Sequence, residues 1–381
     1  MTTEAAIVDG RPSGARAGEL VLSAWSAVSP YGVGREPFSA GVLARRDGVT
    51  ELDRGTFPGP FDSAGVVPDF DCTLYLGKKG TRTMNRATAI AVTMINCLLE
   101  SCGPDLTAKP EELGLVLGAG SGSVQSIMDF TRDSFTGSKP YHVDAMRFPN
   151  TFMNRAAGQS AIWHGIKGPN TTIAGGWLTG LLALSYAVRL YRGGHCPRVL
   201  CGATEEYSEQ RAWLEWSGRN ADSPVTPLGE GGAVFLLEPA GEAAQAGRRP
   251  LARVLGTHFR AFGDTAGARQ ALAECVREAI ERAGVLASDV RVVVPLGDEG
   301  ELREPEEGAI AEVLGTGSPE WVRCRPLFGD TFAASTSLQV AAALAAGEKW
   351  AGPNDLALVT GIDRDGMVGC ALLANGGAGV A

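Results

Sequence analysis

The sequence predicts an α/β fold in which two similar halves form one pseudo-symmetric αβαβα block. Apolar runs typical of strands alternate with segments of helical periodicity in both parts of the chain, which favours parallel strands with right-handed crossovers. At 381 residues the chain exceeds one average domain. Its composition, with 44% hydrophobic residues, 20% charged residues and a mean hydropathy of +0.01, is typical of a globular α/β protein with a large core.

The first half is predicted to span residues 18–245, and residues 1–17, which are small and polar, are predicted to be disordered. Strands are expected at 19–23, 113–118, 198–203 and 232–237. Helices are expected at 82–102, 124–135, 151–163 and 178–191. The first of these helices is indicated by apolar residues at helical spacing, namely Met84, Ala87, Ala91, Met94, Ile95 and Leu98. Residues 46–80 lack any periodicity and predict a long loop.

The second half is predicted to span residues 250–376, after a polar linker over 239–250. It repeats the alternation of the first half. Strands are expected at 251–256, 290–294, 355–360 and 367–373, and helices at 266–283, 305–314 and 334–346.

Charge and cysteine usage exclude several classes of function. The formal net charge is -9 and no basic stripe is visible, so a nucleic-acid partner is not expected. The eight cysteines are scattered without a C-x-x-C pair, and we expect neither a metal site nor a cofactor. No apolar run is long enough to span a bilayer and no signal peptide is visible. These features predict a cytoplasmic protein that does not bind membranes.

The most informative segment is residues 168–180, which reads as a strand, a small-residue turn and a long apolar helix. This pattern is typical of a nucleophile elbow, where a sharp turn raises one side chain at a helix N-terminus. The raised position holds Trp177, and an indole offers one N–H donor but no atom that attacks a carbonyl. The pattern thus predicts a scaffold for covalent catalysis without its nucleophile. The alternative is that Trp177 is an ordinary core aromatic.

An ordered set of motifs resembles the β-ketoacyl synthase branch of the thiolase fold over residues 18–375. The segments that carry the resemblance are 148–151 with Asn154 and 157–158, then 165–170, the elbow, 200–205, 227–233 and 236–238. The resemblance implies the pseudo-duplicated, five-layer αβαβα architecture of the thiolase fold.

The chain departs from ketosynthases at the positions that matter for catalysis. Matching the motifs residue by residue places Trp177 at the catalytic Cys, Leu296 at the first His and Asp330 at the second His. Residues 363–368 match the late glycine-rich loop, with most of its glycines gone. Loss of the Cys and both His removes acylation and the donors that stabilise a decarboxylation enolate. The resemblance therefore implies a chain length factor, the catalytically silent partner of a ketosynthase in a type II polyketide or polyene system.

This resemblance implies a ketosynthase as heterodimer partner and an acyl carrier protein that bears the growing chain. The expected dimer interface is the strand beside the elbow, at Thr171, Thr172, Ile173 and Ala174. The helix after the 121–123 turn is expected to gate the acyl tunnel and set chain length, through Val124, Ile127, Met128 and Phe130. Ordinary packing of that helix is the alternative.

Two other functions stay open at this point. A stand-alone acyltransferase would need a Ser or His catalyst, but no nucleophile is paired with a base in the sequence, and nothing pairs His142 with one. His164 and His195 are expected at the surface or at caps, and Cys201 in the core. A homodimeric acyl-binding protein that keeps the fold is the other alternative.

Overall fold

The computed structural model describes residues 7–8, 11–12, 18–219, 225–297, 300–315 and 317–377. The predicted disorder of residues 1–17 falls on a segment that lies outside this range, apart from the two-residue strands β1 (Ile7–Val8) and β2 (Arg11–Pro12). Asp298, which lies two residues after Leu296, is also outside the described range. Among the described residues, no helix has both the length and the apolar character that a membrane crossing needs.

Ten of the described strands form two five-stranded sheets of the same design. In the first, the order is β8-β7-β9-β11-β3, with bounds Asn170–Ile173, Leu113–Gly118, Arg198–Glu205, Gly231–Pro239 and Leu20–Ser29. In the second, it is β14-β13-β15-β16-β12, with bounds Glu320–Trp321, Val290–Val294, Leu356–Ile362, Met367–Asn375 and Ala252–Ala261. Two β12–β3 residue pairs join them into one continuous sheet, to which β4 (Gly32–Val33) is attached through β3.

The two sheets also share the directions of their strands, which confirms the duplication expected from the sequence. β7 runs parallel to β8 and β9, and β13 runs parallel to β14 and β15. The last two strands of each sheet are antiparallel to their neighbours, so the expectation of parallel strands was wrong for them. The reason is plain between β15 and β16, because the connection over residues 363–366 is too short for the crossover that parallel strands require.

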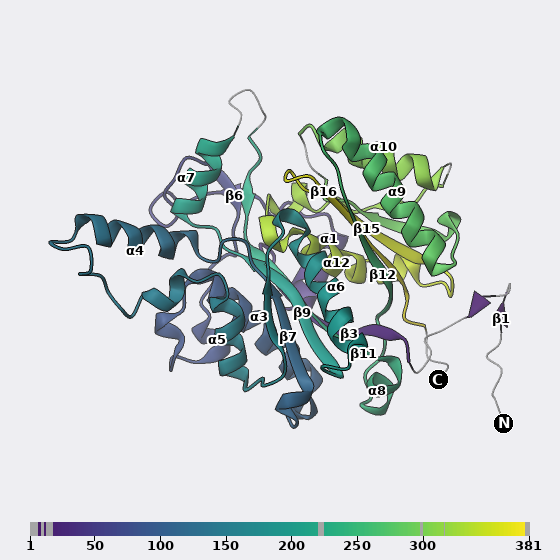
Figure 1. Cartoon of the computed structure of the whole chain (residues 1–381), viewed down its shortest axis with the longest axis horizontal. Coiled ribbons are helices and arrows are strands. Elements are labelled where there is room, and N and C mark those ends of the chain that lie inside the picture. Colours follow the sequence, from purple (N-terminus) through teal and green to yellow (C-terminus); the bar gives the residue numbers. More distant parts are fainter. Residues whose placement is uncertain are drawn as a thin grey trace.

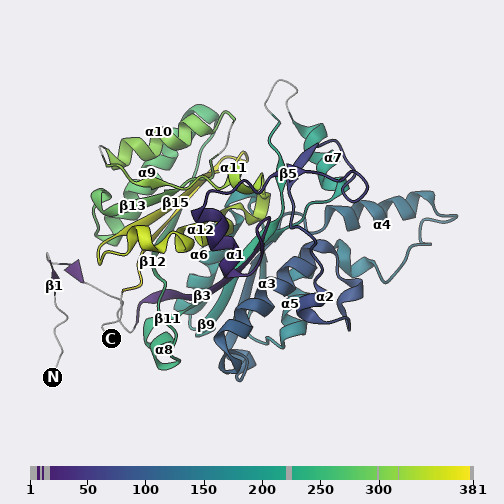
Figure 2. The same cartoon turned by 180° about the vertical axis from the view of Figure 1, so that it is seen from behind.

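Helices and sheets alternate in five layers, as Figures 1 and 2 show. The central layer packs against both sheets and holds α6 and α12, with bounds Thr179–Arg192 and Ser335–Ala345. The outer face of the first sheet is covered by α3 and α5, Arg86–Cys102 and Arg155–His164. The outer face of the second is covered by α9 and α10, Thr265–Ala283 and Arg303–Leu314. This is the five-layer αβαβα architecture that the sequence predicted.

Several elements were not foreseen. The helices α1 (Arg35–Leu43) and α7 (Glu209–Gly218) were missed. The segment 46–80 is more than a loop, because it contains β5, β6 and α2, with bounds Thr50–Glu51, Ser63–Gly65 and Thr73–Leu76. β6 pairs with β5 and with β10 (Leu228–Gly229), so this excursion is tied to the body by a strand far along the chain. The linker holds the short helix α8 (Ala240–Gln245), and α11 spans Arg325–Phe328.

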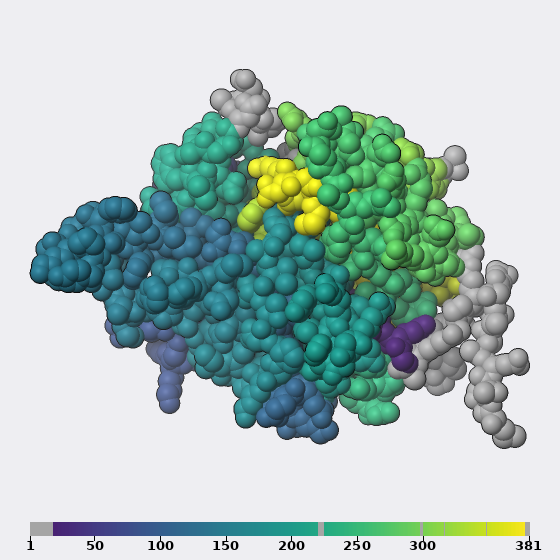
Figure 3. Space-filling model, in the orientation of Figure 1, coloured from purple at the N-terminus to yellow at the C-terminus, as the bar shows by residue number. Residues whose placement is uncertain are grey.

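The helix α4 (Val124–Thr136) projects from the body at one end of the molecule (Figure 1). It contains no buried residue, and in Figure 3 it forms a blue protrusion at the left. We call α4 together with residues 137–153 the arm. Its base is held by Ser123, whose hydroxyl accepts the N–H of Ser126 (3.2 Å) and donates to the buried carboxylate of Glu206 (2.8 Å).

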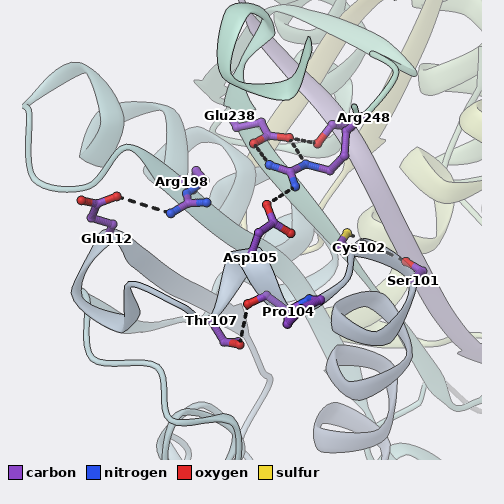
Figure 4. A network of polar contacts seen from close by, with 10 residues as sticks. Ser101, Cys102, Pro104, Asp105, Thr107, Glu112, Arg198, Glu238 and Arg248 are labelled. Carbon is purple, nitrogen blue, oxygen red and sulfur yellow. Dashed lines mark hydrogen bonds and ion pairs between the residues drawn. The ribbon is translucent and has the colours of Figure 1, made fainter. Parts of the chain in front are cut away.

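The linker between the halves is fastened by a buried ion-pair network (Figure 4). The Arg248 guanidinium makes two hydrogen bonds of 2.8 Å to the two carboxylate oxygens of Glu238, which is fully buried in β11. A third bond of 2.8 Å reaches Asp105, and the Ser23 hydroxyl on β3 donates to Glu238. Arg248 thus connects the end of the linker to the first sheet and to the loop after α3.

We expect Arg248→Met to lower the free energy of unfolding by about 3–5 kcal/mol, because the Glu238 carboxylate would stay buried without its cation. The control is Lys167→Met, which removes a solvent-exposed ion pair with Glu111 and should cost less than about 1 kcal/mol. Urea unfolding of both variants measures the difference. Equal losses would contradict the role of the buried network.

Candidate functional site

The segment predicted to be an elbow is a sharp turn at a helix N-terminus. β8 ends at Ile173, a single 3-10 turn spans Gly176–Leu178, and α6 starts at Thr179. The Thr179 hydroxyl donates to the Gly176 carbonyl (2.7 Å) and accepts the Gly175 N–H (2.9 Å), which fixes the turn. Gly176 has φ of +54°, and a Cβ there would lie 1.9 Å from a carboxylate oxygen of Asp363, so only glycine fits.

The structure places Trp177 on this turn with its side chain turned inward, where it is 2% exposed. Its indole N–H donates to Oδ1 of Asp330 at 2.9 Å. The guanidiniums of Arg325 and Arg364 lie over the ring, with Cζ at 4.4 Å and 4.3 Å from the ring centroid. Two of the three positions matched to the catalytic residues of ketosynthases, Trp177 and Asp330, are therefore in direct contact.

Asp330 is buried and surrounded by donors and cations. Burial raises its pKa, but the guanidiniums of Arg325 and Arg211 outweigh that effect and hold the pKa of Asp330 below its usual value. The Arg325 guanidinium lies 3.3 Å from Oδ2, and the Phe332 N–H donates to Oδ1 at 2.9 Å. The Asp330 carboxylate therefore acts here as an acceptor, for the indole N–H of Trp177 and the backbone N–H of Phe332.

The backbone N–H of Trp177 is also occupied. It donates to Oδ2 of Asp363 at 2.5 Å, from the loop that matches the glycine-rich loop of ketosynthases. Asp363 is held in place because its Oδ1 accepts the N–H of Asp365 at 2.8 Å. Burial raises the pKa of Asp363, and the N–H groups of Asp365 and Trp177 partly oppose that shift. A backbone donor at a helix N-terminus, which could otherwise stabilise an oxyanion, is thus already paired with a carboxylate.

Leu296 lies in the apolar cluster that also contains Trp177, and it is 3% exposed. Its backbone N–H and that of Gly297 donate to the two carboxylate oxygens of Glu306, at 2.9 Å and 3.0 Å. Glu306 is fully buried in the first turn of α10, and burial raises its pKa to about 7. Leu296 offers no polar side-chain atom, so this third position adds packing to the site and no chemistry.

A surface cavity of about 430 Å³ reaches this site from outside. Asp330 and Arg364 line it together with Phe61, Phe262 and Leu302 among others. Trp177 itself is almost completely buried, but its two contacts Asp330 and Arg364 both line the cavity. We call Trp177 with Asp330, Asp363, Arg325 and Arg364 the plug.

The other residues singled out in the sequence lie away from the plug. The proposed gating residues are all on the arm, where Met128 is 49% exposed and Val124, Ile127 and Phe130 are partly exposed. Three of the proposed interface residues are on β8, which pairs with β7 on one side and ends the sheet on the other, and Ala174 directly follows this strand. Ala174 is exposed, whereas Thr171, Thr172 and Ile173 are partly buried.

One expectation about the histidines was wrong, because Nδ1 of His142 lies 2.9 Å from the hydroxyl of Ser138. The two residues are four positions apart in the exposed loop that follows α4, so a local turn brings them together. Half-buried His164 ends α5, as expected of a residue near a cap, and its ring bonds to the Val92 carbonyl. Burial lowers its pKa to about 4. Cys201 is in the core as expected, and burial raises the pKa of its thiol to about 12. Within the described residues, no cluster of side chains could hold a metal ion.

Sequence reasoning missed a group of buried glutamates behind the arm. Glu206 and Glu230 accept hydrogen bonds from the starts of several elements, including Ser123 before α4 and Arg86 at the start of α3. Glu205 Oε1 accepts the Glu206 N–H, but Oε2 has no hydrogen-bond partner within the described part of the chain. Burial raises the pKa of Glu205 to about 7, with Glu206 adding to the effect and Arg211 opposing it. The only signal in the sequence for this group of buried glutamates was the pair of adjacent acidic residues, Glu205 and Glu206.

The indole hydrogen bond can be separated from the packing of the ring. Trp177→Phe removes the donor and should lower the free energy of unfolding by about 1–3 kcal/mol, because Asp330 loses one hydrogen bond. Trp177→Ala also leaves a cavity and should cost about 3–5 kcal/mol. Urea unfolding measures the free energy of unfolding of both variants. If Trp177→Phe were as stable as the native protein, the hydrogen bond to Asp330 would contribute nothing to that free energy.

Because of Glu205, the free energy of unfolding should fall as pH rises from about 4.5 to about 7. The folded pKa of Glu205, about 7, lies above the usual value, so from about pH 4.5 to pH 7 the folded chain holds a proton that the unfolded chain has lost. Stability is therefore lost as pH rises through this window, on the order of 3 kcal/mol for this group.

We expect Glu205→Gln to flatten this part of the stability–pH curve, as measured by urea unfolding between pH 5 and pH 8. Glu281→Gln, on the exposed face of α9, is the matched control and should leave the slope unchanged. An unchanged slope in Glu205→Gln would show that the group is ionised in the folded state.

Comparison with known proteins places this geometry in a family. Residues 19–243 match the model of the β-ketoacyl synthase N-terminal domain. A putative polyketide β-ketoacyl synthase 2 of Streptomyces halstedii is 31% identical over 364 residues, which cover 86% of this chain and 84% of that protein. The tetracenomycin polyketide synthase ketoacyl synthase β subunit of Streptomyces glaucescens is 27% identical over 354 residues, covering 85% and 84% of the two chains.

A solved structure is similar over nearly the whole fold. A chain of the ishigamide ketosynthase/chain length factor superposes with a TM-score of 0.86 and 42% sequence identity, covering 94% of this chain and 99% of that one. These comparisons confirm the resemblance to ketosynthases and chain length factors that the motifs indicated. The chain belongs to the β-ketoacyl synthase family.

Proposed function

We propose that this chain is a chain length factor, a non-catalytic subunit that pairs with a ketosynthase and shapes the tunnel for the growing acyl chain. The observation that carries the proposal is the plug. The turn that would present a nucleophile presents Trp177, and both N–H groups of that residue are bound to carboxylates of the same chain.

The plug argues against acylation on three grounds. An indole carries no nucleophilic atom. A tetrahedral oxyanion near the turn would meet the Asp363 carboxylate where it needs a donor, and like charges repel. The buried ring fills the space beside the turn where a thioester would sit. Trp177→Cys would remove the first and third grounds but would leave Asp363 on the backbone donor, so we do not expect that change by itself to restore activity.

Decarboxylation by this subunit is disfavoured for a related reason. An enolate needs donors, and the two positions matched to imidazoles hold Leu296, which has no polar side-chain atom, and Asp330, which is an acceptor. We infer that the partner ketosynthase supplies the nucleophile, both bases and the oxyanion hole.

Pairing with a partner is supported by two features of the surface. β8 is a sheet edge with unpaired backbone groups, which is a ready site for another strand. The arm exposes large apolar side chains, among them Phe135 at 85% and Tyr141 and Met146 at about 70%. Such side chains are costly to leave in water together and indicate a partner surface. Thr171–Ala174 is therefore our proposed centre of the heterodimer interface, and an acyl carrier protein delivers the chain to the complex.

The proposal is tested by comparing the chain alone, its partner ketosynthase alone and the co-expressed pair. Incubated with an acyl thioester, the chain alone should show no mass increase and no turnover, whereas the pair should elongate. Trp177→Cys should also stay unacylated, because Asp363 still occupies the backbone donor. Covalent acylation or elongation by the isolated chain would overturn the assignment and favour a stand-alone acyltransferase.

The gating role of α4 is tested in the same pair. We expect Phe130→Ala or Met128→Ala to shift the products to longer chains, because a smaller side chain leaves more of the tunnel open. Product lengths are measured by mass spectrometry after equal turnover. Unchanged lengths in both variants would remove α4 from the gate.

A further inference from the structure

A second surface cavity, also of about 430 Å³, opens beside the elbow turn. Its sides come from Gly175 at the turn, Phe259 and Ala261 at the end of β12, and Met367 at the start of β16, and its lining is mostly apolar. We call this cavity the socket. In Figure 3 the connection between β15 and β16 appears in yellow on the front face, where the two halves meet. The socket is separate from the cavity at the plug, because the two share no lining residue.

Strand register brings the apolar side chains of the socket to one face of the second sheet. Ala261 pairs with Met367 and Phe259 pairs with Gly369, and residues two positions apart on a strand share a face. The Phe259 ring lies against Gly369, where an added Cβ would come within 2.8 Å of it. An added Cβ on Gly175 would lie 3.7 Å from Cε of Met367, so the elbow turn meets the same apolar side chains.

The rim of the socket, residues 363–366, is a tight turn held by hydrogen bonds. The Asp363 N–H donates to the Met367 carbonyl at 2.7 Å, and the Phe262 N–H donates to the Gly366 carbonyl at 2.8 Å. Gly366 has φ of +90°, a conformation that favours glycine. The Asp363 carboxylate accepts the Trp177 N–H, which ties the rim to the plug. The socket is therefore preformed in this chain, which lowers the entropic cost of filling it.

One charge at the rim has no partner. The Asp365 carboxylate is exposed, and within the described residues no cation pairs with it. Arg260 pairs with Glu274 at 3.0 Å and with Glu278 at 3.1 Å, on α9. Arg364 lies over the indole ring of the plug. The socket thus combines apolar sides with a single unpaired anion at its edge.

The socket continues the surface proposed for the heterodimer. Gly175 directly follows Ala174, the last of the proposed interface residues. On the other side of the socket, β12 pairs with β3 only at Ala252 and Arg253. Among the described strands, residues 254–261 of β12 therefore have a neighbour on one side only. A segment that pairs with β8 and continues past Ala174 would bring its next side chains over the socket.

We propose that the socket receives an apolar side chain of the partner ketosynthase, and that a Lys or Arg next to that side chain pairs with Asp365. This inference rests on the proposed function. A protein segment fits the socket better than a free hydrocarbon does, because only the segment brings a cation at a fixed distance from its apolar group. A small apolar ligand would leave the Asp365 carboxylate unpaired.

The two parts of the socket have different roles in recognition. Burial of an apolar side chain removes both its surface and that of Phe259 and Met367 from water, and this supplies affinity. The Asp365 charge supplies selectivity, because a segment with Asp or Glu at that place would bring like charges together. A second copy of this chain would have to meet the same charge requirement.

The test uses the co-expressed pair with two variants of this chain. Ala261→Trp fills the socket, and Asp365→Lys reverses the charge at its rim. The matched controls are Ala311→Trp on the exposed face of α10 and Glu281→Lys on the exposed face of α9. Analytical ultracentrifugation measures the Kd of each pair, and urea unfolding measures the stability of each variant.

We expect Ala261→Trp and Asp365→Lys each to raise the Kd about tenfold or more, and both controls to stay within about twofold of native. Added salt should weaken the native pair more than a pair with Asp365→Asn, because only the native rim carries a charge that salt can screen. In the native pair, Met367→photo-methionine should cross-link on irradiation to an apolar ketosynthase residue within about two positions of a Lys or Arg.

The outcomes that overturn the inference differ from those that overturn the proposed function. If the native chain forms no pair with a ketosynthase, the proposed function itself fails. If the pair forms but both variants keep the native Kd, the socket is not part of the interface. A cross-link from position 367 to a second copy of this chain, or none to the ketosynthase, assigns the socket to another occupant. If Ala261→Trp proves unstable in urea, Asp365→Lys decides, because its exposed carboxylate has no ion pair within the described chain to lose.

Discussion

Two carboxylates bind the two N–H donors of Trp177, and the character of the whole site depends on that arrangement. Asp330 takes the indole N–H and Asp363 takes the backbone N–H. Two anions beside one buried ring are tolerated because Arg325 and Arg364 lie over its faces. Both N–H donors of Trp177 thus already have partners from the same chain. A substrate would have to displace one of them.

The duplicated architecture makes the differences between the halves informative. The two sheets have the same strand order and directions, so equivalent positions can be compared. After β13 the chain forms α10, which packs against α9. After β7 it forms α4, which projects as part of the arm and buries none of its residues. One half uses its helix to complete its own outer layer, whereas the other leaves an exposed arm and β8 at the edge of the sheet.

Buried acids connect this exposed arm to the interior. Glu206 holds Ser123 at the start of α4 and the Ala87 N–H at the start of α3, and Glu230 pairs with Arg86. Burying these two carboxylates is costly unless donors surround them, and helix starts supply such donors. The arm therefore leaves the body from a fixed base. Its direction is set by hydrogen bonds, while its apolar tip is left for contact.

The sequence by itself determined the elements whose signal is local. The strands at 113–118 and 290–294 match β7 and β13 because continuous apolar runs between turn residues report buried strands directly. The small-residue turn before Trp177 likewise predicted its place at a helix N-terminus. By contrast, α7 was missed because its charged and aromatic residues have weak periodicity, and the antiparallel pairs were missed because strand direction is not written in a local pattern. Only the tertiary structure brought Asp330 to Trp177 across 153 residues of chain and Asp363 across 186, since such contacts depend on how the layers pack and not on the spacing of residues.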